Sequence, residues 1–231
     1  DNKGWTAWHL ACINGQTETA QLLIQSSKDF GIDLNAKHNG GWTGLHYACY
    51  HGQTETDQVL IKSSKESGID LNAKDNIGRT ALHCACQLGQ TETAQSLIKS
   101  SKEFGIVLNA KDDSGWTALH WACGNGRTET AQLLIQSSKE FGIDLNAKDN
   151  IGSTAWHLAC GNGQTETAQL LIKSSKDFGI DLNAKDNNVW TALHGACRFG
   201  LTETAQLLIK SSNDFGIDLN AKDDYGRTAW H

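Results

Sequence analysis

A histidine followed three residues later by a cysteine occurs in six places in this 231-residue chain. Imidazole and thiolate groups are common zinc ligands, and they also act as base and nucleophile in covalent catalysis. A tetrahedral zinc site needs four ligands around one point, whereas one such pair supplies only two. The pairs are His9 with Cys12, His46 with Cys49, His83 with Cys86, His120 with Cys123, His157 with Cys160, and His194 with Cys197.

The regular recurrence of these pairs favours a structural role. Successive pairs are 37 residues apart, and nothing in the sequence singles out one pair from the others. A catalytic or metal site is needed once, whereas a structural element is needed in every repeat. We therefore predict a protein that is not an enzyme and has no cofactor or metal, with metal binding as the alternative. Cys84 lies two residues from Cys86, which would point the two thiols to different sides of a helix, so we predict that Cys84 packs between helices.

One repeated segment accounts for the whole chain. The element Thr-x-x-His recurs every 37 residues, from Thr6 to Thr228. Self-similarity at a fixed period indicates a solenoid, in which each segment buries its apolar side against its neighbours. We predict a single solenoid over residues 1–231, with repeats at 1–37, 38–74, 75–111, 112–148, 149–185 and 186–222 and a partial repeat at 223–231.

The first repeat illustrates the local pattern of turn, helix, turn, helix. Residues 1–4 have turn composition, and Thr6 is placed to cap a short helix that ends near Gly15. Thr17 is expected to cap a second helix, which stops at Gly31. The apolar face of this second helix is predicted from residues at helical spacing, namely Ala20, Leu23, Ile24, Ser27 and Phe30.

The segment Gly115–Ile135, GWTALHWACGNGRTETAQLLI, resembles the ankyrin repeat, whose signature is Thr-Pro-Leu-His-x-Ala with a period of about 33 residues. The resemblance covers the full chain. It implies an all-α, curved helix-turn-helix solenoid with β-hairpin-like turns set at right angles, and it implies that each His braces a turn by hydrogen-bonding the Thr hydroxyl. The second helix segment is longer than the family norm, by about 6 Å, which predicts lengthened outer helices.

Comparison of the repeats separates a constant framework from variable positions. Variation is concentrated at the turn tips and at the ends of the short helices, which the resemblance implies face a partner protein on the concave side. Trp, Tyr and Arg are enriched at interaction hot spots. We predict a partner-binding surface formed by Trp5, Ile13, Trp42, Tyr50, His51, Ile77, Arg79, Leu88, Trp116, Ile151, Trp190, Arg198, Phe199, Tyr225 and Arg227.

The alternative for the aromatic residues at the turns is packing alone. Trp5, Trp42, Trp116 and Trp190 occupy equivalent places in their repeats. Stacking of these side chains on one another would stabilise neighbouring turns without any partner.

Some substitutions within the repeats predict local departures. Trp8, Trp156 and Trp230 replace Leu and are expected in the core, with indole N–H groups that need acceptors. Val189 stands where the other turns have Gly, and a β-branched residue resists a positive φ, so Asn188 is expected to adopt that conformation instead.

Two further substitutions predict weaker packing. Asp57 replaces an Ala in the second repeat, for which we expect a mild penalty. Gly195 stands where most other repeats have a large side chain, so the sixth repeat is expected to be less well packed.

Composition bears on partners and location. The net charge of -6 gives no attraction to nucleic acid or anionic lipid, and no apolar run reaches the length of a membrane span. The N-terminal residues lack a signal-peptide pattern, and regularly spaced cysteines favour reduced thiols, so we predict a cytoplasmic protein. The predicted partner is another protein, with no nucleic acid and no membrane. Because the repeat pattern has no polar terminal units, head-to-tail self-association is the alternative function.

Overall fold

The computed structural model describes residues 2–231, which form helices and turns without a strand. Each repeat contains a short helix followed by a long one, so the predicted all-α fold is confirmed. None of the helices within residues 2–231 is both long and apolar enough to cross a membrane. The chain divides into two compact units, Asp1–Asp113 and Ser114–His231, called unit 1 and unit 2.

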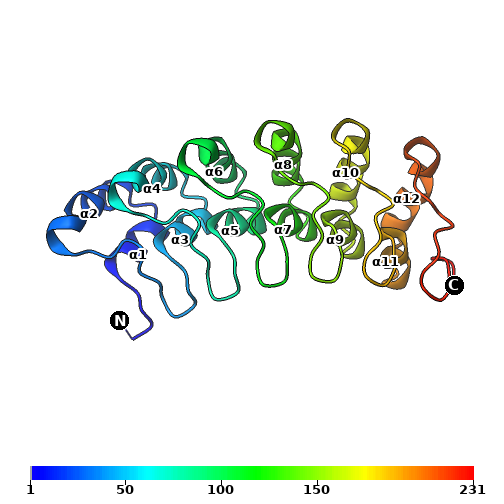
Figure 1. Ribbon diagram of the computed structural model, residues 1–231, viewed down its shortest axis with the longest axis horizontal. Coiled ribbons are helices and arrows are strands. Elements are labelled where there is room, and N and C mark those ends of the chain that lie inside the picture. Colours follow the sequence, from blue (N-terminus) through cyan, green and yellow to red (C-terminus); the bar gives the residue numbers. More distant parts are fainter. Residues whose placement is uncertain (1) are drawn as a thin grey trace. The chain divides into compact units, whose positions relative to one another are not determined.

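Unit 1 has two layers of helices (Figure 1). The short helices pack side by side, as do the long helices, and each short helix also contacts the long helix that follows it. Leu60, Ile61, Leu97 and Ile98 on the long helices are at most 1% exposed and form the centre of the core. The short helices are α1 (Ala7–Ile13), α3 (Gly44–Tyr50) and α5 (Ala81–Leu88); the long helices are α2 (Thr17–Phe30), α4 (Thr54–Ser67) and α6 (Thr91–Phe104).

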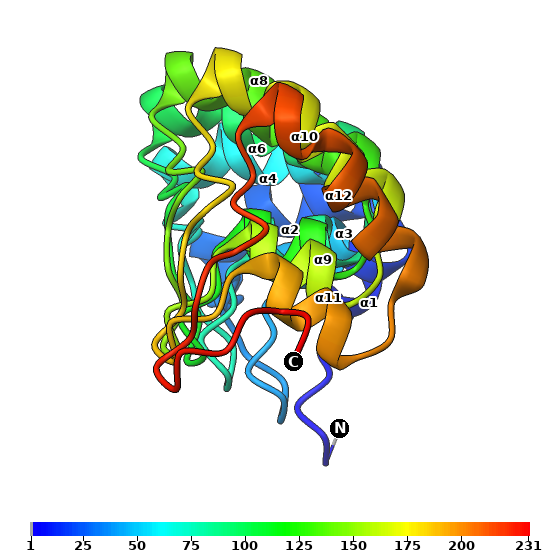
Figure 2. The ribbon, with the colours of Figure 1, turned by 90° about the vertical axis from the view of Figure 1, so that its right-hand side faces the viewer.

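Unit 2 repeats this arrangement. Its long helices lie in one layer and its short helices in another, and Figure 2 shows α12 lying above α11. Leu134, Ile135, Leu171 and Ile172 are buried between the layers. The short helices are α7 (Ala118–Gly124), α9 (Ala155–Gly161) and α11 (Ala192–Arg198); the long helices are α8 (Thr128–Phe141), α10 (Thr165–Phe178) and α12 (Thr202–Phe215).

The short helices begin as predicted, and the long ones do not. Thr6 is the N-cap of α1, where its hydroxyl accepts the backbone N–H of His9. The prediction that Thr17 caps α2 is wrong, because Thr17 is already helical and the N-cap is Gln16. The Thr17 hydroxyl instead lies 2.9 Å from the hydroxyl of Thr56 in the next repeat. The recurring Thr-Glu-Thr sequence therefore links neighbouring repeats.

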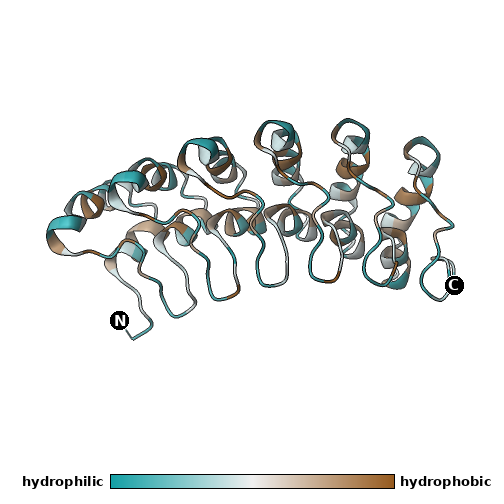
Figure 3. Cartoon of the chain, in the orientation of Figure 1, coloured by the Kyte–Doolittle hydropathy of each residue, from teal (hydrophilic) through white to brown (hydrophobic). Residues whose placement is uncertain are grey.

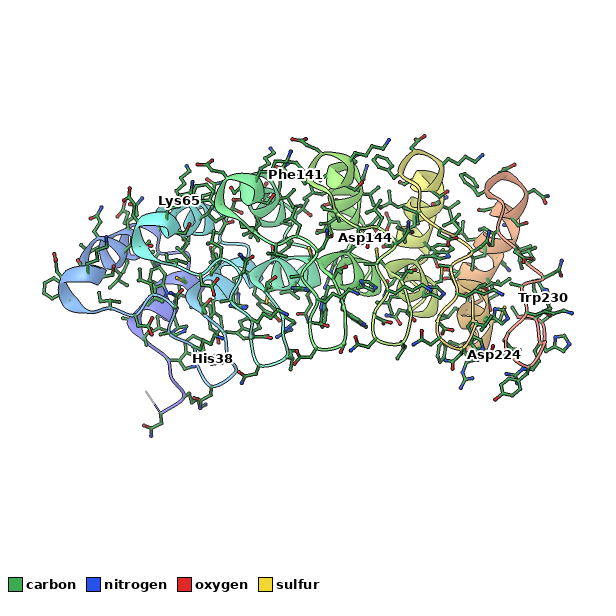
Figure 4. All side chains as sticks on the ribbon, in the orientation of Figure 1. His38, Lys65, Phe141, Asp144, Asp224 and Trp230 are labelled. Atoms are coloured by element: carbon green, nitrogen blue, oxygen red, sulfur yellow. The ribbon has the colours of Figure 1, made fainter. Side chains whose placement is uncertain are left out.

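The predicted apolar face of the long helices is correct for its centre and wrong for its end. Ala20 is fully buried, whereas the side chain of Phe30 is 80% exposed. In later repeats this ring lies outside the core, under a lysine of the preceding repeat: the ammonium group of Lys65, labelled in Figure 4, is 4.8 Å from the ring centroid of Phe104. Such a cation–π contact covers the ring while leaving both side chains near water.

Two of the three tryptophans predicted in the core are there. Trp8 and Trp156 are each 1% exposed, and their indole N–H groups donate to the carbonyl oxygens of Leu34 and Leu182. The prediction for Trp230 is wrong: its side chain, labelled in Figure 4, is 53% exposed. Trp230 lies in a C-terminal turn, not in a helix that could hold it between layers.

The sixth repeat contains a strained turn. Val189 has a φ of 63°, in the left-handed region, and is the only non-glycine residue within residues 2–231 with a positive φ. The expectation that Asn188 would adopt this conformation is therefore wrong. The turn geometry is fixed by its first residue, because Asp186 accepts backbone N–H bonds from Asn188 and Trp190. The position that needs a positive φ stays the same, whichever residue occupies it.

Polar side chains that recur in every repeat tie the turns together. The side chain of Asn35 donates to the carbonyl oxygen of Gly68 and accepts the N–H of Asp70. The ammonium group of Lys37 donates to the carbonyl oxygen of Lys74, 37 residues along the chain. These bonds lie among the mainly hydrophilic turns that Figure 3 shows. The constant Asn and Lys therefore belong to the framework.

Candidate binding surface

The recurring imidazoles of His9, His46, His120, His157 and His194 are each held by two repeats at once. In the second repeat, Nδ1 of His46 accepts the backbone N–H of Thr43 at 3.2 Å and lies 2.9 Å from the Thr43 hydroxyl. Its Nε2–H donates to the carbonyl oxygen of Arg79, since a carbonyl can only accept. Burial lowers the pKa of His46, although the bond to Arg79 opposes this effect. The ring is thus neutral and fully engaged in structure.

Six of the seven cysteines are buried thiols, and Cys197 is partly exposed. Burial raises the pKa of both Cys12 and Cys84 to about 12, and it raises the pKa values of Cys49 and Cys160 well above that of an ordinary thiol. A protonated thiol is neither a good ligand nor a good nucleophile. Within residues 2–231 no group of three or more His, Cys, Asp or Glu side chains could hold a metal ion. The geometry of the His-x-x-Cys pairs therefore fits the structural role.

The predicted partner-binding residues fall into two groups by exposure. Those that are partly buried are Trp5, Ile13, Trp42, Tyr50, Arg79, Leu88, Trp116 and Trp190. Those that are exposed are His51, Ile77, Ile151, Arg198, Phe199, Tyr225 and Arg227. The exposed group belongs to the turn tips and to the ends of the short helices.

A hollow of about 530 Å³ in unit 1 brings together several of these residues. The indole N–H of Trp42 donates to the carboxylate of Asp75 in the next turn, and the guanidinium of Arg79 lies 5.3 Å over the Trp42 ring. Arg79 also forms a 2.8 Å ion pair with Asp75. The predicted residues that line the hollow are Trp42, Tyr50, His51, Ile77 and Arg79.

The carboxylate of Asp75 is locked in its charged form. Although burial by itself would raise its pKa, hydrogen bonds from Arg79 and from the backbone N–H of Ile77 hold the pKa below its usual range. Trp42, Asp75 and Arg79 therefore form one cluster with satisfied polar groups. Part of this surface is structural, because the cluster also braces the turn.

The packing alternative supposed that the turn tryptophans stack on one another. In unit 1 they instead contact a shared ring. Tyr47 lies between them, with ring centroids 4.8 Å from Trp5 and 4.9 Å from Trp42. Tyr47 is buried and comes from the middle of α3. The packing alternative is thus correct in that these rings are packed, and wrong about their partner.

A larger hollow, of about 610 Å³, lies in unit 2. The guanidinium of Arg198 is 4.9 Å over the ring of Trp190, and that of Arg227 is 4.8 Å over the ring of Tyr225. The side chain of Phe199 is 62% exposed and that of Tyr225 is 82% exposed. The predicted residues that line this hollow are Ile151, Trp190, Arg198, Phe199, Tyr225 and Arg227.

The prediction was incomplete at one place of the repeat. Trp5, Ile13, Leu88 and Trp116 line neither of the two hollows. The fourth residue of three short helices does contribute, and the sequence comparison overlooked it as a site position: Tyr47 of α3 lines the first hollow, and Leu158 of α9 and Gly195 of α11 line the second. The signal was present, because this place holds Leu, Tyr, Cys, Trp, Leu and Gly in successive repeats.

Comparisons with known proteins agree with this architecture. A family profile described as "Ankyrin repeats (3 copies)" matches residues 1–75, 60–149 and 141–223. The chain is similar to a solved structure of the ankyrin repeat domain of Bcl-3, described as a unique member of the IkappaB protein family. The identity is 28%, the TM-score is 0.81, and the match covers 98% of this chain and 93% of that chain. No curated protein sequence matches it. This chain belongs to the ankyrin repeat family.

Proposed function

We propose that the chain binds another protein through its turn tips and the ends of its short helices. Ankyrin repeats generally mediate protein–protein interaction and are typically non-enzymatic. The observation that carries the proposal is the exposure of four large apolar side chains beside the two hollows. Ile77 is 50%, Ile151 61%, Phe199 62% and Tyr225 82% exposed.

Contrast with the framework supports this assignment. At the first position of the turn, Asp75 and Asp149 are buried and hydrogen-bonded, whereas two residues later Ile77 and Ile151 face water. Within unit 2, Ile151, Phe199 and Tyr225 line the same hollow, and exposed apolar groups gathered in this way are uncommon on a surface that has no partner. Burial of such side chains contributes about 25 cal/mol per Å² of apolar area removed from water. A partner protein that covers them would gain this free energy.

The test compares capture by two variants. The first carries Ile77→Ser, Ile151→Ser, Phe199→Ser and Tyr225→Ser. The matched control carries the same number of apolar-to-Ser changes at exposed residues outside the proposed surface: Leu22, Phe30, Val107 and Ile209. We expect the immobilised wild type and the control to capture the same proteins from a cell lysate, and the first variant to lose them. Equal capture by both variants, or equal loss, would refute the proposed surface.

Head-to-tail self-association stays a prediction. It requires an apparent mass that rises with concentration, which sedimentation velocity measures. A constant monomer mass across that range would remove it, and a mass that falls in a variant with only Leu22→Ser and Phe30→Ser would implicate the first repeat.

A further inference from the structure

The hollow of unit 2 lacks a ring that the second and fourth repeats supply. In the second repeat, Trp42 contacts Tyr47 with ring centroids 4.9 Å apart. In the fourth, Trp116 contacts Trp121, also at 4.9 Å and nearly edge-on at 67°. In the sixth repeat, Trp190 occupies the same turn position, and the residue five places later is Gly195. Trp190 still stacks on the imidazole of His194, with ring centroids 6.3 Å apart, but the ring that Tyr47 and Trp121 place on the turn tryptophan is absent here.

The space beside Trp190 is open. A Cβ atom added to Gly195 would meet only the Cα of Gly161, at 3.7 Å, and one added to Gly161 would meet nothing within 4 Å. Trp190, Leu158 and Phe199 surround these glycines in the hollow of about 610 Å³. Hollows of about 300–1,000 Å³ are typical of sites that enclose a ligand group.

The positively charged side chain of Arg198 lies at the edge of this space. Arg79 and Arg227 each lie 2.8 Å from a carboxylate of their own turn, in Asp75 and Asp223. Arg198 lies over the Trp190 ring and pairs with no carboxylate within residues 2–231. Its guanidinium retains N–H donors for a carboxylate from outside the chain.

Two acids of the hollow limit how much negative charge a ligand can carry. Asp186 is engaged by the backbone N–H groups of Asn188 and Trp190, and Asp224 is exposed near Tyr225. A run of acidic residues would meet repulsion there, whereas a single carboxylate beside Arg198 would not.

We propose that this hollow receives an aromatic side chain of the partner, inserted beside Trp190 above Gly161 and Gly195, with an adjacent carboxylate of the partner bound by Arg198. The inference rests on the proposed protein-binding function and specifies its ligand: a segment in which one acidic residue neighbours one aromatic residue. The inserted ring takes the place that Tyr47 has beside Trp42. The edge-on contact and the charge-assisted hydrogen bonds together give recognition.

The first test uses a defined probe, the peptide acetyl-Gly-Ser-Glu-Trp-Gly-Ser-amide, titrated into the full ¹⁵N-labelled chain. We expect saturable shifts of the Gly161 and Gly195 amide signals and of the Trp190 indole signal. Replacement of the peptide Glu by Lys should weaken binding about ten-fold or more, and replacement of its Trp by Ala should abolish it. If the Lys peptide binds as tightly, or if no peptide shifts these signals, the inference is overturned.

The second test changes the chain. Gly195→Trp supplies the missing ring from the chain itself, as Trp121 does beside Trp116. It should abolish peptide binding and leave the melting temperature unchanged. Arg198→Gln should weaken binding about ten-fold and remove the preference for Glu over Lys. The matched variant Trp121→Gly removes the ring beside Trp116, at a repeat with Gly124 in place of an arginine. It should therefore add an aromatic site without preference for Glu. Unchanged peptide binding in Gly195→Trp overturns the inference.

The outcomes also separate this inference from the proposed function. If Gly195→Trp still captures the partner while the variant of Ile77, Ile151, Phe199 and Tyr225 does not, the surface stands and the aromatic site is wrong. If both still capture it, both proposals are wrong.

Discussion

Nε2 of His46 lies 2.9 Å from the carbonyl oxygen of Arg79, a residue 33 places later and in the next repeat. The same contact joins His9 to Trp42 and His157 to Trp190. One side chain therefore fixes its own turn through Thr and the following turn through a backbone carbonyl. This double role explains why the histidine recurs in every repeat.

Removal of one such imidazole should destabilise unit 1. His46 is 1% exposed, so His46→Ala would leave the Arg79 carbonyl without its donor and open a cavity. We expect a loss of about 2–4 kcal/mol in the free energy of unfolding, measured by urea denaturation. His51→Ala, at an exposed position, is the control and should cost less than about 0.5 kcal/mol. Equal effects of the two changes would contradict the bridging role.

Acid should weaken the fold through these histidines. Burial lowers the pKa values of His9, His46 and His157 below 6.5. The unfolded chain then binds protons more readily than the folded chain, so stability is full above pH 6.5 and falls as the pH drops below it. The midpoint of urea denaturation should decrease as the pH is lowered from 7.5 to 5. Constant midpoints in the Asp57→Ala background, where the opposing contribution described next is absent, would refute this.

Asp57 should make the fold more stable, rather than less stable, as the pH is lowered. Its carboxylate is fully buried, and neither oxygen has a hydrogen-bond partner within the described residues. Burial raises its pKa from 3.8 to about 7, so the folded chain holds this proton more tightly than the unfolded chain. The contribution of Asp57 to the free energy of unfolding is most favourable below pH 3.8 and is lost as the pH rises to about 7. The loss amounts to at most about 4 kcal/mol.

Asp57→Ala tests this directly, because Ala occupies the same place in the other complete repeats. We expect a gain of about 2–4 kcal/mol in unfolding free energy at pH 8 and a smaller gain at pH 5. Glu55→Ala, at an exposed position of the same helix, serves as the control. A gain that is equal at both pH values would show that the charge is not responsible.

Val189→Gly should stabilise unit 2. The equivalent residues Gly115 and Gly152 have φ values of 81° and 80°, and a β-branched residue is strained in this region. Relief of strain, reduced by the larger entropy of Gly in the unfolded chain, should give a net gain of about 1 kcal/mol. Thermal unfolding measures it, with Val107→Gly as the comparison. A lower melting temperature for Val189→Gly would contradict the strain.

The regular elements could be predicted from the sequence because their causes are local. The cap at Thr6, the stop at Gly31 and the apolar spacing of Leu60 and Ile61 each depend on a few neighbouring residues. The bond between the hydroxyls of Thr17 and Thr56 depends on how two repeats meet, and no local rule predicts it. The prediction of a cap at Thr17 failed for that reason.

The candidate surface was predicted in part. Variation between repeats identified Ile77, Phe199 and Tyr225, which are exposed. It did not identify Tyr47 or Gly195, because a buried ring and an absent side chain show their importance only when the neighbouring repeat is in place.

The bonds between turns have a consequence for the evolution and engineering of this chain. The side chain of Asn146 donates to Gly179, and that of Lys148 donates to Lys185, as Asn183 and Lys185 do to Gly216 and Lys222. Excision of residues 149–185 would bring Asn146 to Gly216 and Lys148 to Lys222, with every donor offered the same acceptor as before. Whole 37-residue repeats can thus be removed, added or reordered without any redesign of the hydrogen bonds between neighbouring turns.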